Sequence, residues 1–287
     1  MALPEIRPLS FGETLDRSFA FYRSHFLALA TICLIPGVIV SPMNLLLRMP
    51  VGAVPDPRTL LRYFVWIYAY LFVYMFINFL AMSANVFAIS EIYLGREVTV
   101  GAAYRKVRQR FWALLNLWIS VGLRVIGCIV TIVLIPLAPL LFLWYAFSIP
   151  VLLVEKIKVG KALKRSRELT KGIRGQIFLT FVLMMILGYI VAFVFQAPFL
   201  FLQAKIVPKG RISPAWLTLL SGLMGAAGGA FTTPPLMVAL TLQYFNTRVL
   251  REGYDLQLML ERLGSGTAAG VIPTANPGIT PESTSTA

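Results

Sequence analysis

The stretch EKIKVGKALKRSRELTKG, residues 155–172, lies between two long apolar runs, and the rest of the chain is arranged around it. It is basic and has helical spacing, with apolar residues on one side and lysine or arginine on the other. Residues 160–166 read G-x-x-L-x-R-S, residues 12–18 have the same pattern, and residues 100–106 form a looser copy. Each copy precedes a pair of apolar runs. The pattern therefore predicts three units, each a surface helix followed by a hairpin of membrane helices.

The composition indicates a helical membrane protein that crosses the bilayer several times. Of the 287 residues, 58% are hydrophobic and 13% are charged, which is more apolar surface than a soluble chain of this length can bury. Several runs reach the roughly 20 residues that a helix needs to span a bilayer. The predicted fold class is all-α, with six transmembrane helices as three hairpins, each preceded by a cytoplasmic amphipathic interfacial helix. The predicted spans are residues 27–47, 63–89, 112–134, 137–154, 176–203 and 215–245.

The first surface helix is predicted over residues 10–26. Ser10 and Glu13 have the spacing of a capping box. Phe11, Leu15, Phe19, Tyr22 and Phe26 recur at helical spacing and form an apolar stripe. Such a helix either lies in the membrane interface with its aromatic side in the acyl boundary, or packs on the cytoplasmic ends of the bundle. The sequence leaves both arrangements open.

Residues 112–154 contain a single charge, Arg124, and are too long for one span. Pro136 and Pro139 would break a continuous helix, so the run is expected to turn there. Basic loops usually stay on the cytoplasmic side. The basic segments 90–111 and 155–175 lie on the same side of the membrane only if the apolar run between them comes back to the side on which it started. A full hairpin and a re-entrant loop both satisfy that requirement.

Prolines also interrupt the other apolar runs, at Pro36, Pro198 and the pair 234–235, where kinks or breaks are expected. Asn78 and Asn85 lie inside the second run and need partners within the bundle, since lipid offers none. Residues 246–263 are expected to form a separate polar-to-amphipathic helix that ends an integral membrane domain, residues 1–263. Residues 264–287 are rich in Gly, Ser, Thr, Pro and Ala and are expected to be a disordered tail.

The charge distribution predicts the orientation. Eight Lys or Arg residues lie in 155–175 and five in 90–111, against three each in 48–62 and 204–214. By the positive-inside rule both termini are cytoplasmic, in a bacterial-type inner membrane. The net charge of +14 would indicate nucleic acid in a soluble protein. Here the basic residues flank apolar runs, so anionic lipid headgroups are the expected partners, and nucleic acid is not.

Candidate binding residues are therefore basic. A charge inside an apolar run, such as Arg124, is costly and should face the bundle or a wet cavity. It holds an anionic group, acts as a hydrogen-bonded strut, or lies nearer the membrane surface than the run suggests. The basic cluster in 155–172 either enforces topology or grips anionic lipid. The residues selected as headgroup or anion candidates are Arg124, Lys161, Lys164, Arg165, Arg167 and Lys171.

Catalysis is not expected. No acid lies inside an apolar run, and the only histidine, His25, cannot build a metal site alone. No nucleophile motif or phosphate-cradling glycine loop is found, so neither a cofactor nor a metal is predicted. Cys33 and Cys128 fall inside apolar runs and are expected to be core residues.

Three stretches together resemble a membrane-domain family of bacteria and archaea that is named after glycerophosphoryl diester phosphodiesterase. The first is residues 12–19 with Tyr22 and Phe26, and the second is residues 150–155 followed by the basic helix. The third, near the end of the last apolar run, is the most specific. Its motif residues, with those of the repeats, are Gly12, Arg17, Gly160, Arg165, Ser166, Tyr244, Arg248, Glu252, Gly253, Tyr254 and Asp255.

The family is named for members in which this module precedes a soluble phosphodiesterase domain. This sequence has no room for such a domain, so the resemblance implies a stand-alone membrane module and not an enzyme. The predicted function is binding of anionic lipid, or of a membrane or cytoplasmic partner protein, through basic cytoplasmic surface helices. The alternative is a transporter of a small solute or lipid, with a site near Arg124 between proline-broken helices.

Overall fold

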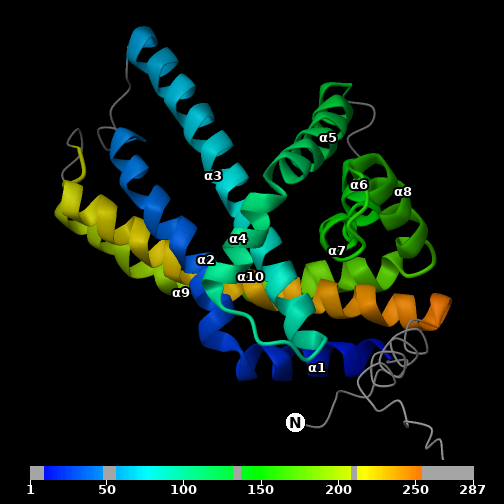
Figure 1. Cartoon of the computed structure of the whole chain (residues 1–287). Coiled ribbons are helices and arrows are strands. Elements are labelled where there is room, and N and C mark those ends of the chain that lie inside the picture. Colours follow the sequence, from blue (N-terminus) through cyan, green and yellow to red (C-terminus); the bar gives the residue numbers. More distant parts are fainter. Residues whose placement is uncertain (1–9, 48–55, 132–136, 208–211, 254–287) are drawn as a thin grey trace, which may run out of the picture.

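The computed structural model describes residues 10–47, 56–131, 137–207 and 212–253 (Figure 1). Within these ranges the chain is helical and has no β-strand. Five helical segments are long and apolar enough to cross a membrane. This confirms an all-helical, multi-pass membrane protein. The five segments are Phe26–Leu47, Pro57–Tyr93, Phe111–Cys128, Arg174–Ile206 and Ala215–Glu252.

The helices match the predicted spans closely, with extensions at their ends. The first span is α2 (Phe26–Val40) followed by the 3-10 helix η1 (Ser41–Leu47). The helices at the predicted second, fifth and sixth spans are longer than predicted. Polar residues beyond each apolar run continue the helix. The bounds of these helices, with that of the third span, are α3 (Pro57–Tyr93), α5 (Phe111–Val130), α9 (Arg174–Ile206) and α10 (Ala215–Glu252).

The segment predicted as a span over residues 137–154 consists of two short helices. These are α6 (Leu137–Trp144) and α7 (Ser148–Val154), separated by a turn at residues 145–147. Neither reaches the length of a span, so the described residues provide five candidate spans and not six. The preceding turn was expected at residues 135–139; residues 135 and 136 lie outside the described residues, and residues 137–139 begin α6.

All three predicted surface helices are present: α1 (Phe11–Ser24), α4 (Val100–Gln109) and α8 (Val159–Thr170). Ser10 and Glu13 form the expected capping box. The three helices have a similar burial pattern, since two positions four residues apart are buried in each of them. These pairs are Thr14 and Ser18, Ala103 and Val107, and Ala162 and Ser166.

This pattern indicates that each surface helix packs on the bundle through the face that carries its buried residues. In α1 the most buried residues are the small Thr14 and Ser18 and not the aromatic stripe, whose Phe19 is exposed. Each hydroxyl bonds a backbone carbonyl one turn earlier, so no polar group is lost when the helix packs closely. Small side chains let helices approach, which the aromatic residues could not do.

Helix α10 is the central element of the fold. Figure 1 shows it running through the molecule beside α9, and it also contacts α2, α1, η1, α3 and α8. Its first half packs closely on α2, because a Cβ added to Gly37 would come within 2.5 Å of the Ala226 Cβ. Its second half carries Tyr244 and Phe245, both fully buried in a core shared with the three surface helices.

Of the kinks or breaks expected at the prolines of the other apolar runs, the breaks are not found. Pro36, Pro198 and the pair Pro234 and Pro235 all lie inside continuous helices. A proline removes the hydrogen bond to the carbonyl four residues earlier. In a membrane, neighbouring helices can supply the missing donor, and at two of these sites the structure identifies it.

Two tyrosines of the surface helices are these donors. The Tyr104 hydroxyl of α4 donates to the Ile32 carbonyl at 2.6 Å, which is the carbonyl that Pro36 leaves unpaired. The Tyr22 hydroxyl of α1 donates to the Phe231 carbonyl at 3.2 Å. Pro235 has no amide hydrogen to donate to this carbonyl. Burial raises the pKa of both phenols, that of Tyr22 to about 12, so both remain protonated donors at neutral pH.

The separate helix predicted over residues 246–263 is also not found in its described part. Residues 246–252 continue α10 without a break, because the buried face with Tyr244, Thr247 and Val249 extends past the apolar run. The helix then ends at Gly253, which adopts the left-handed conformation (φ 57°) that glycine tolerates. The predicted end of this helix and the tail at 264–287 lie outside the described residues.

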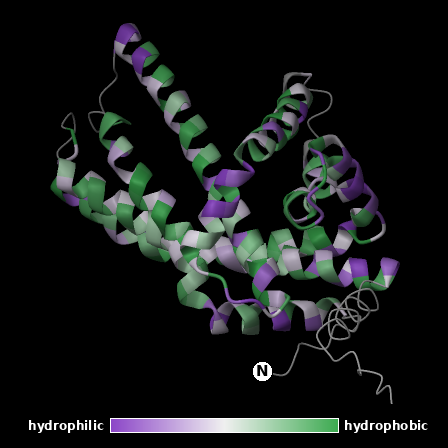
Figure 2. Cartoon of the chain, in the orientation of Figure 1, coloured by the Kyte–Doolittle hydropathy of each residue, from purple (hydrophilic) through white to green (hydrophobic). Residues whose placement is uncertain are grey.

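The outer surfaces of the long helices are apolar. On α9, Tyr189 and Phe193 are about 70% exposed, and the first half of α3 is similarly exposed at Leu61 and Tyr68. Figure 2 shows hydrophobic residues along α2 and α9, and hydrophilic residues on α8 and at the end of α10. So large an apolar surface would be a liability in water and is normal against lipid.

Replacing Tyr104 with phenylalanine should destabilise the protein, because the Ile32 carbonyl then loses its donor in an apolar environment. The expected loss is about 1 to 3 kcal/mol, measured as a lower midpoint of unfolding by SDS in detergent micelles. Tyr68→Phe, on the exposed face of α3, is the control and should leave the midpoint unchanged. Equal effects of the two substitutions would contradict the role given to the Tyr104 hydroxyl.

Candidate functional site

Four charged side chains meet where α7, α8 and the end of α10 come together. Arg165 pairs with Glu252 and lies 3.6 Å from the Glu155 carboxylate. Arg248 lies 3.1 Å from Glu252 and 4.0 Å from Glu155. We call these four residues the charged cluster. Each arginine lies between two carboxylates, so the charges within it balance.

The local sequence positions each member of the charged cluster. Arg248 and Glu252 are four residues apart and share one face of α10. Glu155 ends α7, directly before the basic stretch. Tyr244 lies one turn before Arg248, and its hydroxyl donates to Glu155 at 3.0 Å. The side chains of the cluster are mostly shielded from solvent, so screening by water is reduced.

A second contact joins α10 to the end of α8. The Arg251 guanidinium donates to the carbonyls of Glu168, at 2.9 Å, and Lys171. Carbonyls at the end of a helix lack partners within it and carry partial negative charge, which an arginine stabilises. Gly172 follows with φ of 91°, which turns the chain toward α9.

Ser166 joins α8 to the turn between α6 and α7. Its hydroxyl donates to the Trp144 carbonyl at 2.8 Å and accepts from the Phe147 amide at 3.2 Å. The Trp144 carbonyl needs this donor because the Ser148 amide bonds Tyr145 instead. Arg167 lies over the Trp144 ring, 4.3 Å from its centre. Helix α8, like α1 and α4, therefore provides hydrogen-bond partners for backbone groups of an apolar segment, here at the turn between α6 and α7.

The sequence-selected motif residues divide into two groups. Arg165, Ser166, Arg248 and Glu252 come together at this end of α10, although 87 residues separate Arg165 from Glu252. Gly253 ends the helix beside them, whereas Tyr254 and Asp255 lie outside the described residues.

The remaining motif residues lie elsewhere. Arg17 of α1 bonds the side chain of Tyr93, whose ring stacks on Phe245 of α10. Gly12 and Gly160 are exposed, and a Cβ at either would meet nothing within 4 Å. Neither glycine is required by its surroundings.

The headgroup candidates are also separated by the fold. Arg165 belongs to the charged cluster, where two carboxylates already neutralise it. Lys161, Lys164 and Arg167 are exposed on α8, and Lys171 is exposed directly after its last residue. Arg124 is exposed on α5, donates to the Ser120 carbonyl of its own helix at 2.6 Å, and lies 5.8 Å from the centre of the Tyr145 ring. It contacts none of the other candidates.

The sequence pattern predicts no partner for several residues that the geometry shows to matter. Glu155 completes the charged cluster, and Tyr22 and Tyr104 serve proline-freed carbonyls. A signal existed for the tyrosines, since each proline in an apolar run implies a donor from another helix. Of the two asparagines, Asn85 bonds the Cys33 sulfur at 2.9 Å, as required, whereas Asn78 bonds the Tyr74 carbonyl of its own helix.

The chain was compared with family models, curated proteins and solved structures, and none of them matches it.

A double-mutant cycle on Arg165→Gln and Glu252→Gln should reveal coupling within the charged cluster. We expect about 1 kcal/mol or more, because the pair is partly shielded. The pair Arg96 and Glu91, 2.9 Å apart on α3 and its following turn, has an exposed arginine, so it is the control and should give no more than about 0.5 kcal/mol. Equal coupling in the two cycles, measured by SDS unfolding, would show that the cluster contributes no more than a surface pair.

Proposed function

We propose that this chain is a non-enzymatic integral membrane module that binds anionic lipid headgroups through the basic face of α8, assisted by α4. A membrane or cytoplasmic protein with an acidic surface is an alternative partner for the same face. The proposal includes a bacterial-type inner membrane, cytoplasmic termini, and three hairpins in which residues 112–154 form the second. It agrees with the resemblance to a stand-alone membrane module.

The observation that carries the proposal is the division of charge on α8. Arg165 is already paired with carboxylates, whereas Lys161, Lys164, Arg167 and Lys171 are exposed. One acid, Glu168, is exposed within the same helix. The face that points away from the bundle therefore has an excess of positive charge.

Chain connectivity supports a position near the headgroups. Helix α8 ends at Thr170 and the apolar helix α9 begins at Arg174, so α8 is held within one turn of a candidate span. Helix α4 ends at Gln109 and is followed directly by α5 at Phe111, and its Arg105 and Arg108 are exposed. A basic residue near an anionic bilayer surface gains about 1 kcal/mol.

The alternative of a transport site near Arg124 has weaker support. Arg124 lines neither of the two cavities described below, and its guanidinium bonds its own helix. Amide side chains inside the apolar helices line a cavity that Arg124 does not reach.

Replacing Lys161, Lys164 and Lys171 together by glutamine should weaken binding of phosphatidylglycerol. Three side chains at about 1 kcal/mol each correspond to a loss on the order of 100-fold. The measurement is native mass spectrometry of the detergent-solubilised protein titrated with phosphatidylglycerol or phosphatidylcholine. The control replaces Arg58, Arg62 and Lys205, which are exposed at the other end of the bundle. If the control weakens binding equally, net charge and not α8 governs it.

The orientation can be tested with single cysteines, because both native cysteines are buried. A membrane-impermeant maleimide added to intact cells should label Asp56→Cys and should label Lys164→Cys only after lysis. Both positions are exposed and so report access alone. Labelling of Lys164→Cys in intact cells would reverse the orientation and remove α8 from the cytoplasmic surface.

A further inference from the structure

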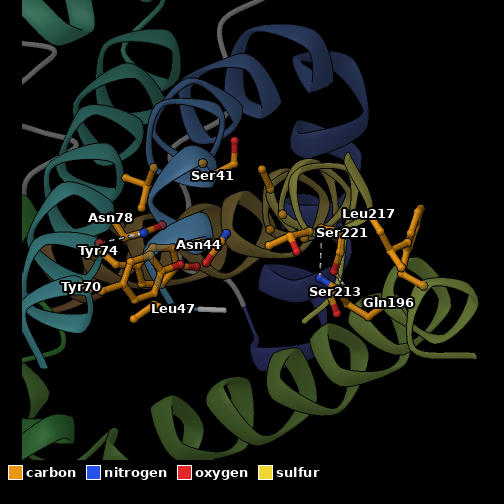
Figure 3. Close-up of a pocket in the computed structure, with 18 of the residues that line it drawn as sticks. Ser41, Asn44, Leu47, Tyr70, Tyr74, Asn78, Gln196, Ser213, Leu217 and Ser221 are labelled. Atoms are coloured by element: carbon orange, nitrogen blue, oxygen red, sulfur yellow. Dashed lines mark hydrogen bonds between the residues drawn. The ribbon is translucent and has the colours of Figure 1, made fainter. Parts of the chain in front are cut away.

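A polar cavity lies inside the bundle, between α2, η1, α3, α9 and α10. Its volume is about 520 Å³, within the roughly 300 to 1,000 Å³ of small-molecule sites. It is at the opposite end of α10 from the charged cluster, since its lining runs from Leu217 to Thr233. Figure 3 shows Asn44, Tyr70, Tyr74 and Asn78 on one side, and Gln196 and Ser221 on the other.

The lining is polar but uncharged. Four amide side chains reach it, from Asn44, Asn78, Gln196 and Gln203, together with several serine, threonine and tyrosine hydroxyls. None of the described lining residues is Asp, Glu, Lys, Arg or His. An ionic ligand would therefore find no counter-charge, whereas hydroxyl or amide groups would find both donors and acceptors.

Polar side chains are costly inside apolar helices, so four amide side chains around one cavity are expected to have hydrogen-bond partners there. Some of the groups pair across the cavity wall: Gln203 donates to Ser213 at 2.6 Å, and Gln196 and Ser221 bond each other. Asn78 contacts only its own helix among the bonds described, at the Tyr74 carbonyl. No bond between helices requires Asn78 to be polar, which fits a side chain that serves the cavity.

Glycines on α10 create the space for these amides. A Cβ at Gly222 would lie 2.8 Å from the Asn44 amide nitrogen, and one at Gly225 would lie 2.5 Å from that of Gln196. Gly229 lines the cavity too, but a Cβ there would meet nothing within 4 Å. Two of the glycines thus fit the side chains around them, and the third faces open space.

Aromatic rings complete the lining. Tyr70 and Tyr74 stack with their ring centres 5.8 Å apart, and both line the cavity together with Asn44. A tyrosine offers an apolar ring face beside a polar hydroxyl. A tyrosine ring face can contact C–H groups, and a neighbouring amide can bond hydroxyl groups. A sugar or polyol presents both kinds of group.

We propose that this cavity binds an uncharged polyhydroxyl group, such as a sugar or polyol. The group could be a free solute or the sugar headgroup of a lipid, because the cavity would contact the same hydroxyls in either. A second cavity of about 600 Å³, lined by apolar residues including Phe142, Phe181 and Leu236, shares Thr233 with the first. It provides a place for an acyl chain if the source is a lipid. This inference is independent of the proposed binding at α8.

The probes are glucose, monoglucosyl diacylglycerol and gluconate, tested on the whole chain in detergent micelles. Binding is measured as the rise of the thermal unfolding midpoint with probe concentration. We expect a saturable rise with the glycolipid, and also with glucose if a free solute is the source. A rise with the glycolipid alone assigns the site to a headgroup. No rise with either, or an equal rise with gluconate, overturns the proposal.

Two variants locate the binding. Gly229→Leu places a side chain in the open space of the cavity, and Asn78→Leu removes a lining amide that makes no described bond to another helix. Each should reduce the apparent affinity at least tenfold. Gly127→Leu, an equally unobstructed glycine on α5 outside the cavity, is the matched control and should bind normally. Unchanged affinity in both Gly229→Leu and Asn78→Leu would place binding elsewhere and overturn the proposal.

Discussion

The backbone carbonyls that prolines leave unpaired are the constraint on which this structure depends. An apolar helix in lipid must satisfy every backbone polar group internally, yet α2 and α10 each contain proline. The missing donors come from the surface helices, through Tyr104 to Ile32 and Tyr22 to Phe231. The third surface helix does the same at the α6 to α7 turn through Ser166. Each surface helix is thereby fixed to an apolar segment, across 72 residues for α4, 209 residues for α1 and 22 residues for α8.

This arrangement gives the molecule two chemically different ends around α10. Its C-terminal half is enclosed by a continuous core and ends in the charged cluster, where Arg165 and Arg248 are paired with Glu155 and Glu252. Its N-terminal half is rich in glycine and faces the amide-lined cavity. The C-terminal half of α10 thus holds the surface helices in place, whereas the N-terminal half borders the cavity. A single helix connects the two, so a ligand in the cavity and a lipid on α8 would act on the same element.

The charged cluster also explains why a basic stretch can serve two purposes. Arg165 is shielded and paired, so it holds α8 in place. Lys161 and Lys164 are exposed on the same helix, Lys171 is exposed directly after it, and these lysines have no such duty in the described structure. With α8 fixed, its lysines are presented without the loss of backbone freedom that a flexible basic loop would suffer on binding.

The sequence by itself determined the membrane class, the three surface helices and the five long spans, because apolar run length and helical spacing are local properties. It also selected Arg165, Arg248 and Glu252 as motif residues. Only the tertiary structure decided that Pro36 and Pro235 leave their helices intact, that residues 137–154 divide into two helices, and that α10 continues to Glu252. Only the fold brought Asn44 and Asn78 opposite Gln196. Each of these outcomes depends on a partner many residues away, and a local pattern carries no information about that partner.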